Sequence, residues 1–124
     1  MNGRLYSTVE HAFQAAKSLD PKDRTRVRQA LTPVEARRRG GKVAVRADWS
    51  SIRLAVMEDL VRQKFRDPEL RRRLVATGSE ELVDPSTPAD PFWGRRGGAG
   101  ENHLGQILMR IRADAAGEVQ AAHN

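Results

Sequence analysis

The segment Tyr6–Lys17 reads YSTVEHAFQAAK, and the fold and the chemistry of this chain are best inferred outward from it. Its apolar residues recur at helical spacing and predict the inward face of a helix over residues 8–18, namely Val9, Phe13 and Ala16. Glu10, Gln14 and Lys17 fall at i, i+4 and i+7, so they share a neighbouring face. A carboxylate there can act as a general acid or base, and an amine as a nucleophile. A solvated Glu/Lys face on a surface helix accounts for the same spacing.

A second alternative concerns Glu10 itself. Ser7 and Glu10 match the capping-box pattern, in which the Ser hydroxyl accepts from a backbone N–H of the first turn. The Glu side chain then reaches back to the cap. The pattern by itself leaves both the capping role and a reactive role open.

Proline, glycine and capping patterns predict further helices outward from this segment. The predicted ranges are 21–31, 33–40, 48–65, 68–78 and 102–116, with a short strand at 81–83. Val27, Ala30 and Leu31 form the predicted apolar face of the second helix, and Gly40-Gly41 predicts a left-handed end for the third. The expected fold is mainly α, a single multihelical domain over residues 1–124 with at most a few short strands. We expect residues 117–124 to form a frayed tail.

Residues 84–100 are rich in proline and glycine and are predicted to form an extended loop. Glycines in this loop lead into the helix predicted at Asn102, and backbone N–H groups at a helix start attract anions. Trp93 could stack on a flat base, and Asp90 could accept a hydrogen bond from a ribose hydroxyl. The alternative is a surface loop with Phe92 and Trp93 packed in the core.

Three further features allow two interpretations each. Asp48 is either the N-cap of the long helix or a second carboxylate for the site. The clusters Arg37–Arg39 and Arg71–Arg73 are solvated helix faces or contacts to a polyanion. The net charge of +6 favours a partner that carries phosphate, a nucleotide or a nucleic acid. However, 18 arginines against 4 lysines could also reflect a GC-rich genome.

The composition also excludes several classes of site. Without cysteine there is no disulfide, thiolate catalyst or cysteine-ligated zinc, and three histidines without ligand spacing predict no metal site. No apolar run approaches the roughly 20 residues that span a bilayer, so we expect no membrane partner. The first residues lack the apolar region of a signal peptide, which predicts a cytoplasmic protein.

Beyond the first helix, several motifs follow in a specific order: Arg46-x-Asp48-Trp49, Arg53-x3-Met57, Lys64-Phe65, Leu74-x2-Thr77-Gly78, Leu82-Val83, Asp90-x-Phe92-Trp93-Gly94 and Gly100-x-Asn102-x-Leu104-Gly105. Together with Tyr6–Lys17 they resemble the NADAR/YbiA-like family over roughly residues 3–113. The resemblance implies a mainly helical domain that hydrolyses N-glycosidic bonds without a metal or other cofactor. Members act on phosphorylated ribosylamino-pyrimidines of riboflavin biosynthesis, and others remove ADP-ribose from guanine.

The resemblance also implies roles for individual residues. Glu10 would be the acid/base and Lys17 a possible covalent amine, with Asp48 as a further catalytic carboxylate. The implied substrate-binding residues are His11, Gln14, Trp49, Asp90, Phe92, Trp93, Gly94 and Asn102. The partner would be a phosphorylated ribosyl or ADP-ribosyl small molecule, and nucleic acid is the alternative partner.

The sequence departs from the family in one respect. Family members usually carry a Phe-rich segment ahead of the first helix, whereas Met1 falls almost directly on it here. We therefore expect this chain to lack that segment, either through a misassigned start codon or through truncation.

The alternative class is a non-catalytic basic protein that binds nucleotides or nucleic acid. The sequence does not predict an oligomeric state.

Overall fold

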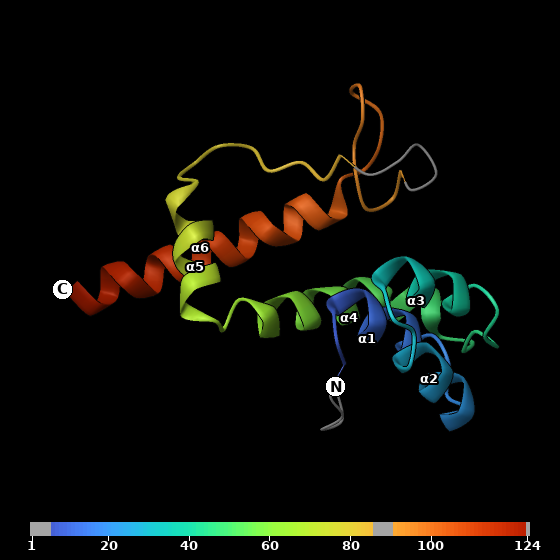
Figure 1. The fold of residues 1–124 in the computed structure, drawn as a ribbon. Helices are drawn as coiled ribbons and strands as arrows, with labels where there is room; N and C mark the ends of the chain where they lie inside the picture. The colour runs from blue at the N-terminus through green and yellow to red at the C-terminus, as the bar shows by residue number, and fades with distance from the viewer. Residues whose placement is uncertain (1–5, 86–90, 124) are drawn as a thin grey trace. The chain divides into compact units, whose positions relative to one another are not determined.

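The computed structural model describes residues 6–85 and 91–123, with side chains up to Glu118. These residues form six helices and no strand (Figure 1), so the mainly α prediction is confirmed. The helices are α1 (Val9–Ala16), α2 (Pro21–Arg28), α3 (Pro33–Gly40), α4 (Trp49–Lys64), α5 (Pro68–Ala76) and α6 (His103–His123). The chain divides into two compact units, one ending at Leu60 and the other starting at Val61. Each unit is described by itself.

The N-terminus of α1 differs from the predicted capping box. Thr8, not Ser7, is the N-cap: its backbone is extended, and its Oγ1 accepts from the His11 N–H at 3.1 Å. Glu10 therefore stands one position earlier in the helix than a capping box requires. Of the two alternatives for Glu10, the capping box is therefore not formed, and its carboxylate binds Arg37 and Gln14.

The second helix begins where predicted and ends earlier. Asp20 caps it, with its Oδ1 accepting from the Lys22 N–H at 2.9 Å, and Pro21 occupies the first turn. It stops at Arg28, so only part of the predicted apolar face packs inward: Val27 and Ala30 are buried, whereas Leu31 is 94% exposed. The chain has left the helix before Leu31, which is why the prediction failed for that residue.

The third helix begins at the predicted cap but ends differently. The Thr32 Oγ1 accepts from the Glu35 N–H at 3.1 Å, as its pattern predicts. The C-cap Gly41 has a right-handed φ of −70°, so the predicted left-handed end is wrong. Gly40 is needed for another reason: a Cβ there would lie 2.1 Å from the Gln14 Oε1 and 2.7 Å from the Gln14 Cβ. Its missing side chain lets α3 approach α1.

The core of the first unit is built from small side chains. Buried residues from α1, α2, α3 and the segments that follow α2 and α3 pack together, with Tyr6 against them: Ala15, Val27, Ala30, Ala36 and Val43. Small residues allow the three short helices to approach one another closely (Figure 1). The positions of side chains on α1 therefore depend closely on how α3 packs against it.

This packing makes Gly40 and Gly41 a matched pair for a stability test. Gly40→Ala should lower the free energy of unfolding by about 1–3 kcal/mol, because its methyl group would overlap Gln14. Gly41→Ala should be neutral or stabilising, because its nearest neighbour, the Arg38 carbonyl oxygen, would lie at an ordinary 3.4 Å. Urea denaturation of both variants tests this, and equal effects would contradict the assigned contact.

The second unit packs the end of α4 with α5 and α6. Its buried apolar side chains include Val61, Leu74, Ile107 and Ile111. Gly78, at φ +70°, follows the C-cap of α5 as predicted. The last helix continues to His123, past the predicted end at Ala116. Among the described residues, no helix combines the length and the apolar character needed to cross a bilayer.

The predicted strand at 81–83 is wrong, although the backbone there does form a pair of hydrogen bonds. The Asn102 side chain takes the place of a neighbouring strand: its Nδ2 donates to the Leu82 carbonyl at 2.9 Å, and its Oδ1 accepts from the Asp84 N–H at 3.0 Å. A single amide satisfies one carbonyl and one N–H of the segment without any ladder. The β propensity of a segment does not show whether its backbone will pair with a neighbouring strand or with a side-chain amide.

Candidate active site

Glu10 is held by one of its two carboxylate oxygens. Its Oε1 accepts from the Arg37 Nε at 2.8 Å and from the Gln14 Nε2 at 3.1 Å. Among the described residues none donates to Oε2, and the side chain is 21% exposed. The carboxylate is thus oriented through one of its two oxygens.

Gln14 supports this arrangement from within α1. The side chain is buried, its Nε2 donates to Glu10, and its Oε1 has no hydrogen-bond partner among the described residues. That oxygen lies against the backbone of Gly40. In the first unit, therefore, the Gln14 amide contacts Glu10 and α3.

His11, predicted to bind substrate, is buried and uses both ring nitrogens within the protein. Its Nε2 lies 2.9 Å from the Ala30 carbonyl oxygen, and its Nδ1 lies 2.7 Å from the Thr8 Oγ1. Because a carbonyl only accepts, Nε2 carries the proton, and in the neutral ring Nδ1 accepts from the Thr8 hydroxyl. The ring thus links the start of α1 to the segment after α2.

Lys17 is the half-buried C-cap of α1. Seven residues rise about 10 Å along a helix, so Glu10 and Lys17 are separated by roughly two turns. The Lys17 carbonyl accepts from the Arg46 N–H at 2.7 Å, which brings the segment before α4 to the end of α1.

Arg46 in turn binds Asp48 through two hydrogen bonds. Its Nε lies 2.6 Å from Oδ1 and its Nη2 lies 3.0 Å from Oδ2. These hydrogen bonds, reinforced by the positive charge of the guanidinium, lower the pKa of the Asp48 carboxyl below its ordinary value. Asp48 is therefore ionised at neutral pH, where it can stabilise positive charge but cannot donate a proton.

This pair gives a prediction about pH. Arg46→Ala should raise the pKa of Asp48 towards that of an ordinary aspartate, because the main cause of its depression is removed. In the wild-type chain, the stability that the pair contributes is present above the unfolded-state pKa and is lost as the pH falls through the lower folded-state pKa. A carbon-detected NMR titration of Asp48 measures the change. An unaltered titration would contradict the pairing, and Arg38→Ala serves as the control.

Trp49, another predicted substrate-binding residue, opens α4 and is half-buried. Its ring centroid lies 5.0 Å from that of the buried Phe13, with the rings tilted by 50°. This contact places one aromatic face of α4 against the apolar side of α1.

In the second unit, the aromatic loop (residues 91–94) folds onto the start of α6. The Phe92 ring lies edge-on to Trp93 with centroids 4.8 Å apart, and 4.4 Å from the ring of His103. Gly94 is buried, and its carbonyl accepts from the Asn102 N–H at 3.1 Å. Asn102 is fully buried at φ 54°, with its amide on Leu82 and Asp84 as described above. Asp90 lies outside the described residues.

The predicted anion site at the start of this helix is not formed. The backbone N–H groups that were expected to be open instead donate to carbonyls of the aromatic loop: Glu101 to Pro91, Asn102 to Gly94, His103 to Phe92 and Leu104 to Trp93. Gly97 and Gly98, both at positive φ, form a tight turn between Arg96 and Ala99. The loop therefore caps α6 itself, which sequence composition could not indicate.

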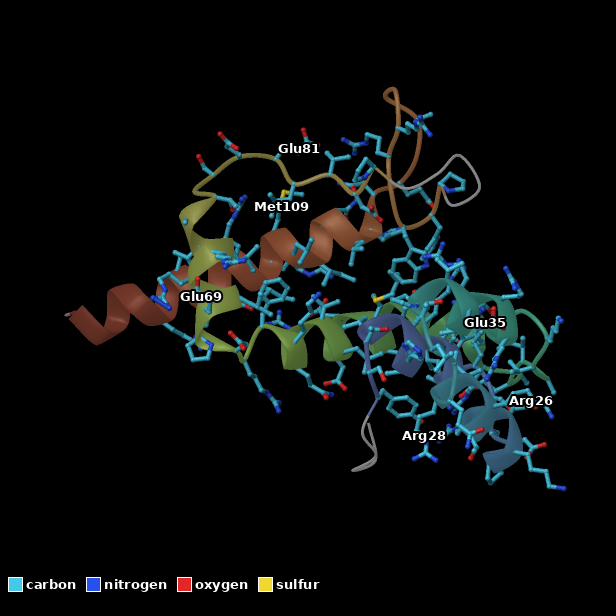
Figure 2. The ribbon with its side chains drawn as sticks, in the orientation of Figure 1. Arg26, Arg28, Glu35, Glu69, Glu81 and Met109 are labelled. Atoms are coloured by element: carbon cyan, nitrogen blue, oxygen red, sulfur yellow. The ribbon has the colours of Figure 1, made fainter. Side chains whose placement is uncertain are left out.

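The arginine clusters are mostly paired with carboxylates. Arg38 and Arg39 bind Glu35, and Arg72 and Arg73 bind Glu69 (Figure 2 labels both glutamates). Arg71 pairs with Glu118. The first member of the first cluster, Arg37, binds Glu10 instead, a contact that the sequence did not predict. It is 27 positions from Glu10, and no periodicity connects them.

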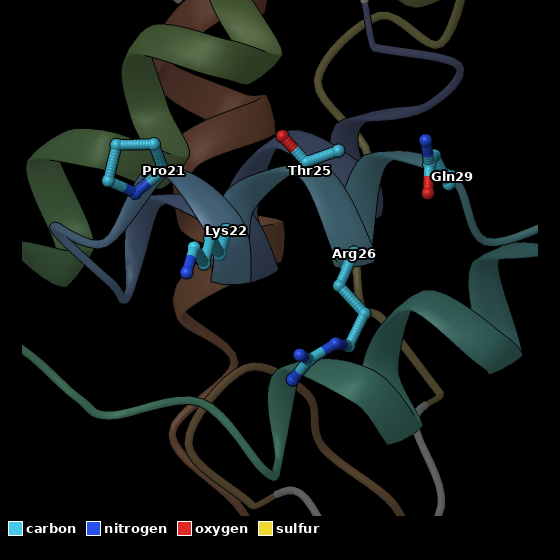
Figure 3. Close-up of a pocket in the computed structure, with 5 residues that line it drawn as sticks. All are labelled: Pro21, Lys22, Thr25, Arg26 and Gln29. Atoms are coloured by element: carbon cyan, nitrogen blue, oxygen red, sulfur yellow. The ribbon is translucent and has the colours of Figure 1, made fainter.

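A hollow of about 470 Å³ runs beside α2 and is lined by Pro21, Lys22, Thr25, Arg26 and Gln29 (Figure 3). Its residues all belong to α2 or its immediate end, and none is a predicted site residue. The arrangement around Glu10 has oriented hydrogen bonds, whereas this hollow has only an open surface. The arrangement around Glu10 is therefore the candidate site of this chain.

Comparisons with known proteins agree on one family. The NADAR domain model matches residues 1–115. N-glycosidase YbiA of Escherichia coli is 39% identical over 120 residues, covering 94% of this chain and 74% of that protein. The chloroplastic riboflavin biosynthesis protein PYRR of Zea mays is 37% identical over 137 residues, covering 98% of this chain and 22% of that protein. The NMR structure of E. coli YbiA matches with a TM-score of 0.84 and 38% identity, covering 97% of this chain and 73% of that chain.

Proposed function

This chain belongs to the NADAR family, and on that basis we propose that it hydrolyses the bond between ribose C1 and the amine nitrogen of a phosphorylated ribosylamino-pyrimidine. Similar proteins carry the names N-glycosidase and riboflavin biosynthesis protein, which supports both the reaction and the substrate class. The observation that carries the proposal is the Glu10 carboxylate, which two donors orient through Oε1 while no described residue donates to Oε2.

The proposed reaction needs a proton at the departing nitrogen and negative charge near C1. The C1–N bond breaks with its electron pair going to nitrogen, and positive charge develops on the sugar. Asp48, ionised at neutral pH, is the proposed second carboxylate that stabilises this charge. Water adds to C1 as the Glu10 carboxylate takes a proton from it, and Glu10 passes that proton to the departing nitrogen, giving ribose phosphate and a free aminopyrimidine.

Lys17 gives this scheme a covalent variant. Its amine can attack C1 of the opened sugar, displace the aminopyrimidine and form a Schiff base, which water then hydrolyses to release the sugar. Borohydride reduces such a linkage to a stable amine. A mass increase on Lys17 after reduction in the presence of substrate supports the covalent route, and its absence during turnover supports direct attack by water.

In the second unit, Trp93 stays a predicted stacking surface for a base. It is half-buried, and its neighbour Phe92 is fixed between it and His103. The Asn102 amide binds the backbone through both its nitrogen and its oxygen, so we propose that it shapes this loop and does not itself contact substrate.

The same chemistry applies to ADP-ribose on guanine, so the two substrates need a direct comparison. Most guanidinium groups of the two clusters are engaged with carboxylates, which argues against a polyanion-binding surface built from them. The test is to measure kcat/KM for a ribosylamino-pyrimidine phosphate and for an ADP-ribosylated guanine oligonucleotide. A higher value for the pyrimidine supports the proposal, and turnover of the oligonucleotide alone would overturn the substrate assignment.

A further inference from the structure

Arg37 lies on α3, and we propose that it is a positioning residue for Glu10: it fixes the carboxylate so that Oε2 faces the substrate. The inference rests on the proposed function, which assigns Glu10 the proton transfer. Its basis is the hydrogen bond of 2.8 Å from the Arg37 Nε to the Glu10 Oε1, between residues of different helices. No other described arginine contacts this carboxylate.

The packing of α3 on α1 brings Arg37 to this place. Gly40 lies against Gln14, where no larger residue fits, and Arg37 precedes Gly40 by one helical turn. Glu10 likewise precedes Gln14 by one turn of α1. The close contact between Gly40 and Gln14 therefore sets the register that places Arg37 beside Glu10. The Gln14 Nε2 then supplies the second donor to the same oxygen.

The chemistry of arginine suits this role. A guanidinium directs its N–H groups in a fixed plane, so a bond from Nε constrains the orientation of the carboxylate as well as its position. Both donors act on Oε1, which leaves Oε2 without a donor among the residues that the structure describes. A lysine in place of Arg37 would keep the positive charge and lose this direction.

Arg38 provides a control that is matched in several respects. It is adjacent on α3, carries the same charge and has the same 66% side-chain exposure as Arg37, but it pairs with Glu35. Arg37→Ala and Arg38→Ala thus remove the same charge from the same surface. A difference between them reports on the contact with Glu10 and not on net charge.

The expected result for Arg37→Ala is a fall in kcat of about 10²-fold with little change in KM, since misplacing a reacting group by about 1 Å can cost that much. Arg37→Lys should recover part of the loss, and Arg38→Ala should retain wild-type kcat. In a Glu10→Gln background, Arg37→Ala should have no further effect, because the two residues act as a unit. A rise in KM alone, or equal losses in the two alanine variants, would overturn the inference.

A second readout separates this inference from the proposed function. The ¹³C chemical shift of the Glu10 carboxyl carbon should change in Arg37→Ala and not in Arg38→Ala, whether or not a substrate is known. Absence of turnover by the wild-type chain on every N-ribosyl substrate would defeat the proposed function. A Glu10 carboxyl shift that is the same in wild type and Arg37→Ala would defeat the positioning role.

Discussion

Glu10→Gln should lower kcat by about 10²- to 10⁴-fold, the range that general acid–base catalysis contributes. The substitution keeps the size of the side chain and an oxygen that accepts from Arg37 and Gln14. It removes the ability of the second oxygen to give and take a proton. The loss should therefore appear in kcat more than in KM. Steady-state kinetics on the ribosylamino-pyrimidine phosphate measures both.

Glu35→Gln is the control for this experiment. Glu35 also binds two arginines, Arg38 and Arg39, and its replacement changes the net charge equally. Its side chain takes no part in the arrangement around Glu10, so kcat should stay at the wild-type value. Undiminished kcat in Glu10→Gln, or an equal loss in both variants, would contradict the assigned role.

Gly105→Ala should be among the most destabilising single methyl additions in the chain, at about 3 kcal/mol. A Cβ at this position would lie 2.2 Å from the Leu82 carbonyl oxygen and 2.4 Å from the Asn102 Nδ2. The Leu82 carbonyl is backbone and is held by that same amide, so it cannot swing aside. The variant should also disturb the aromatic loop, because the Asn102 backbone N–H binds Gly94.

Gly117→Ala, in the same helix, is the matched control. Nothing lies within 4 Å of a Cβ at Gly117, so the higher helix propensity of alanine should stabilise the chain by up to about 1 kcal/mol. Urea denaturation should show a lower free energy of unfolding than wild type for Gly105→Ala and a higher one for Gly117→Ala. A Gly105→Ala variant as stable as Gly117→Ala would contradict the described packing of residues 82–84.

Patterns that are local in sequence predicted most of the helix boundaries. Asp20-Pro21 and Thr32-Pro33 start helices because a proline at the first helical position and a capping oxygen act within one turn. The errors arose where a tertiary contact decides the outcome. Gly40 resembled a left-handed cap, but its lack of a side chain serves the contact with Gln14. Leu31 continued an apolar pattern in sequence beyond the point at which α2 ends.

In the candidate site too, patterns local in sequence predicted some contacts, and contacts between helices were missed. The shared face of Glu10 and Gln14 follows from helical spacing, and the structure joins these two side chains by a hydrogen bond. Arg37 could not be found this way, because its contact depends on how one helix packs against another. The glycine-rich loop allowed either an open anion site or a packed surface loop, and carbonyls of residues 91–94 accept from the N–H groups at the start of α6. Composition indicates which hydrogen-bonding groups a segment contains, but not which groups they bind in the folded chain.

The most direct test of the proposed activity is the release of ribose phosphate. The wild-type chain is incubated with a phosphorylated ribosylamino-pyrimidine, and free sugar phosphate is followed by ¹H NMR alongside the Glu10→Gln variant. We predict formation of ribose phosphate and aminopyrimidine in equal amounts by the wild-type chain, at a rate at least about 10²-fold above that of the variant. Release at the same rate by both proteins, or no release by the wild type, would contradict the assignment.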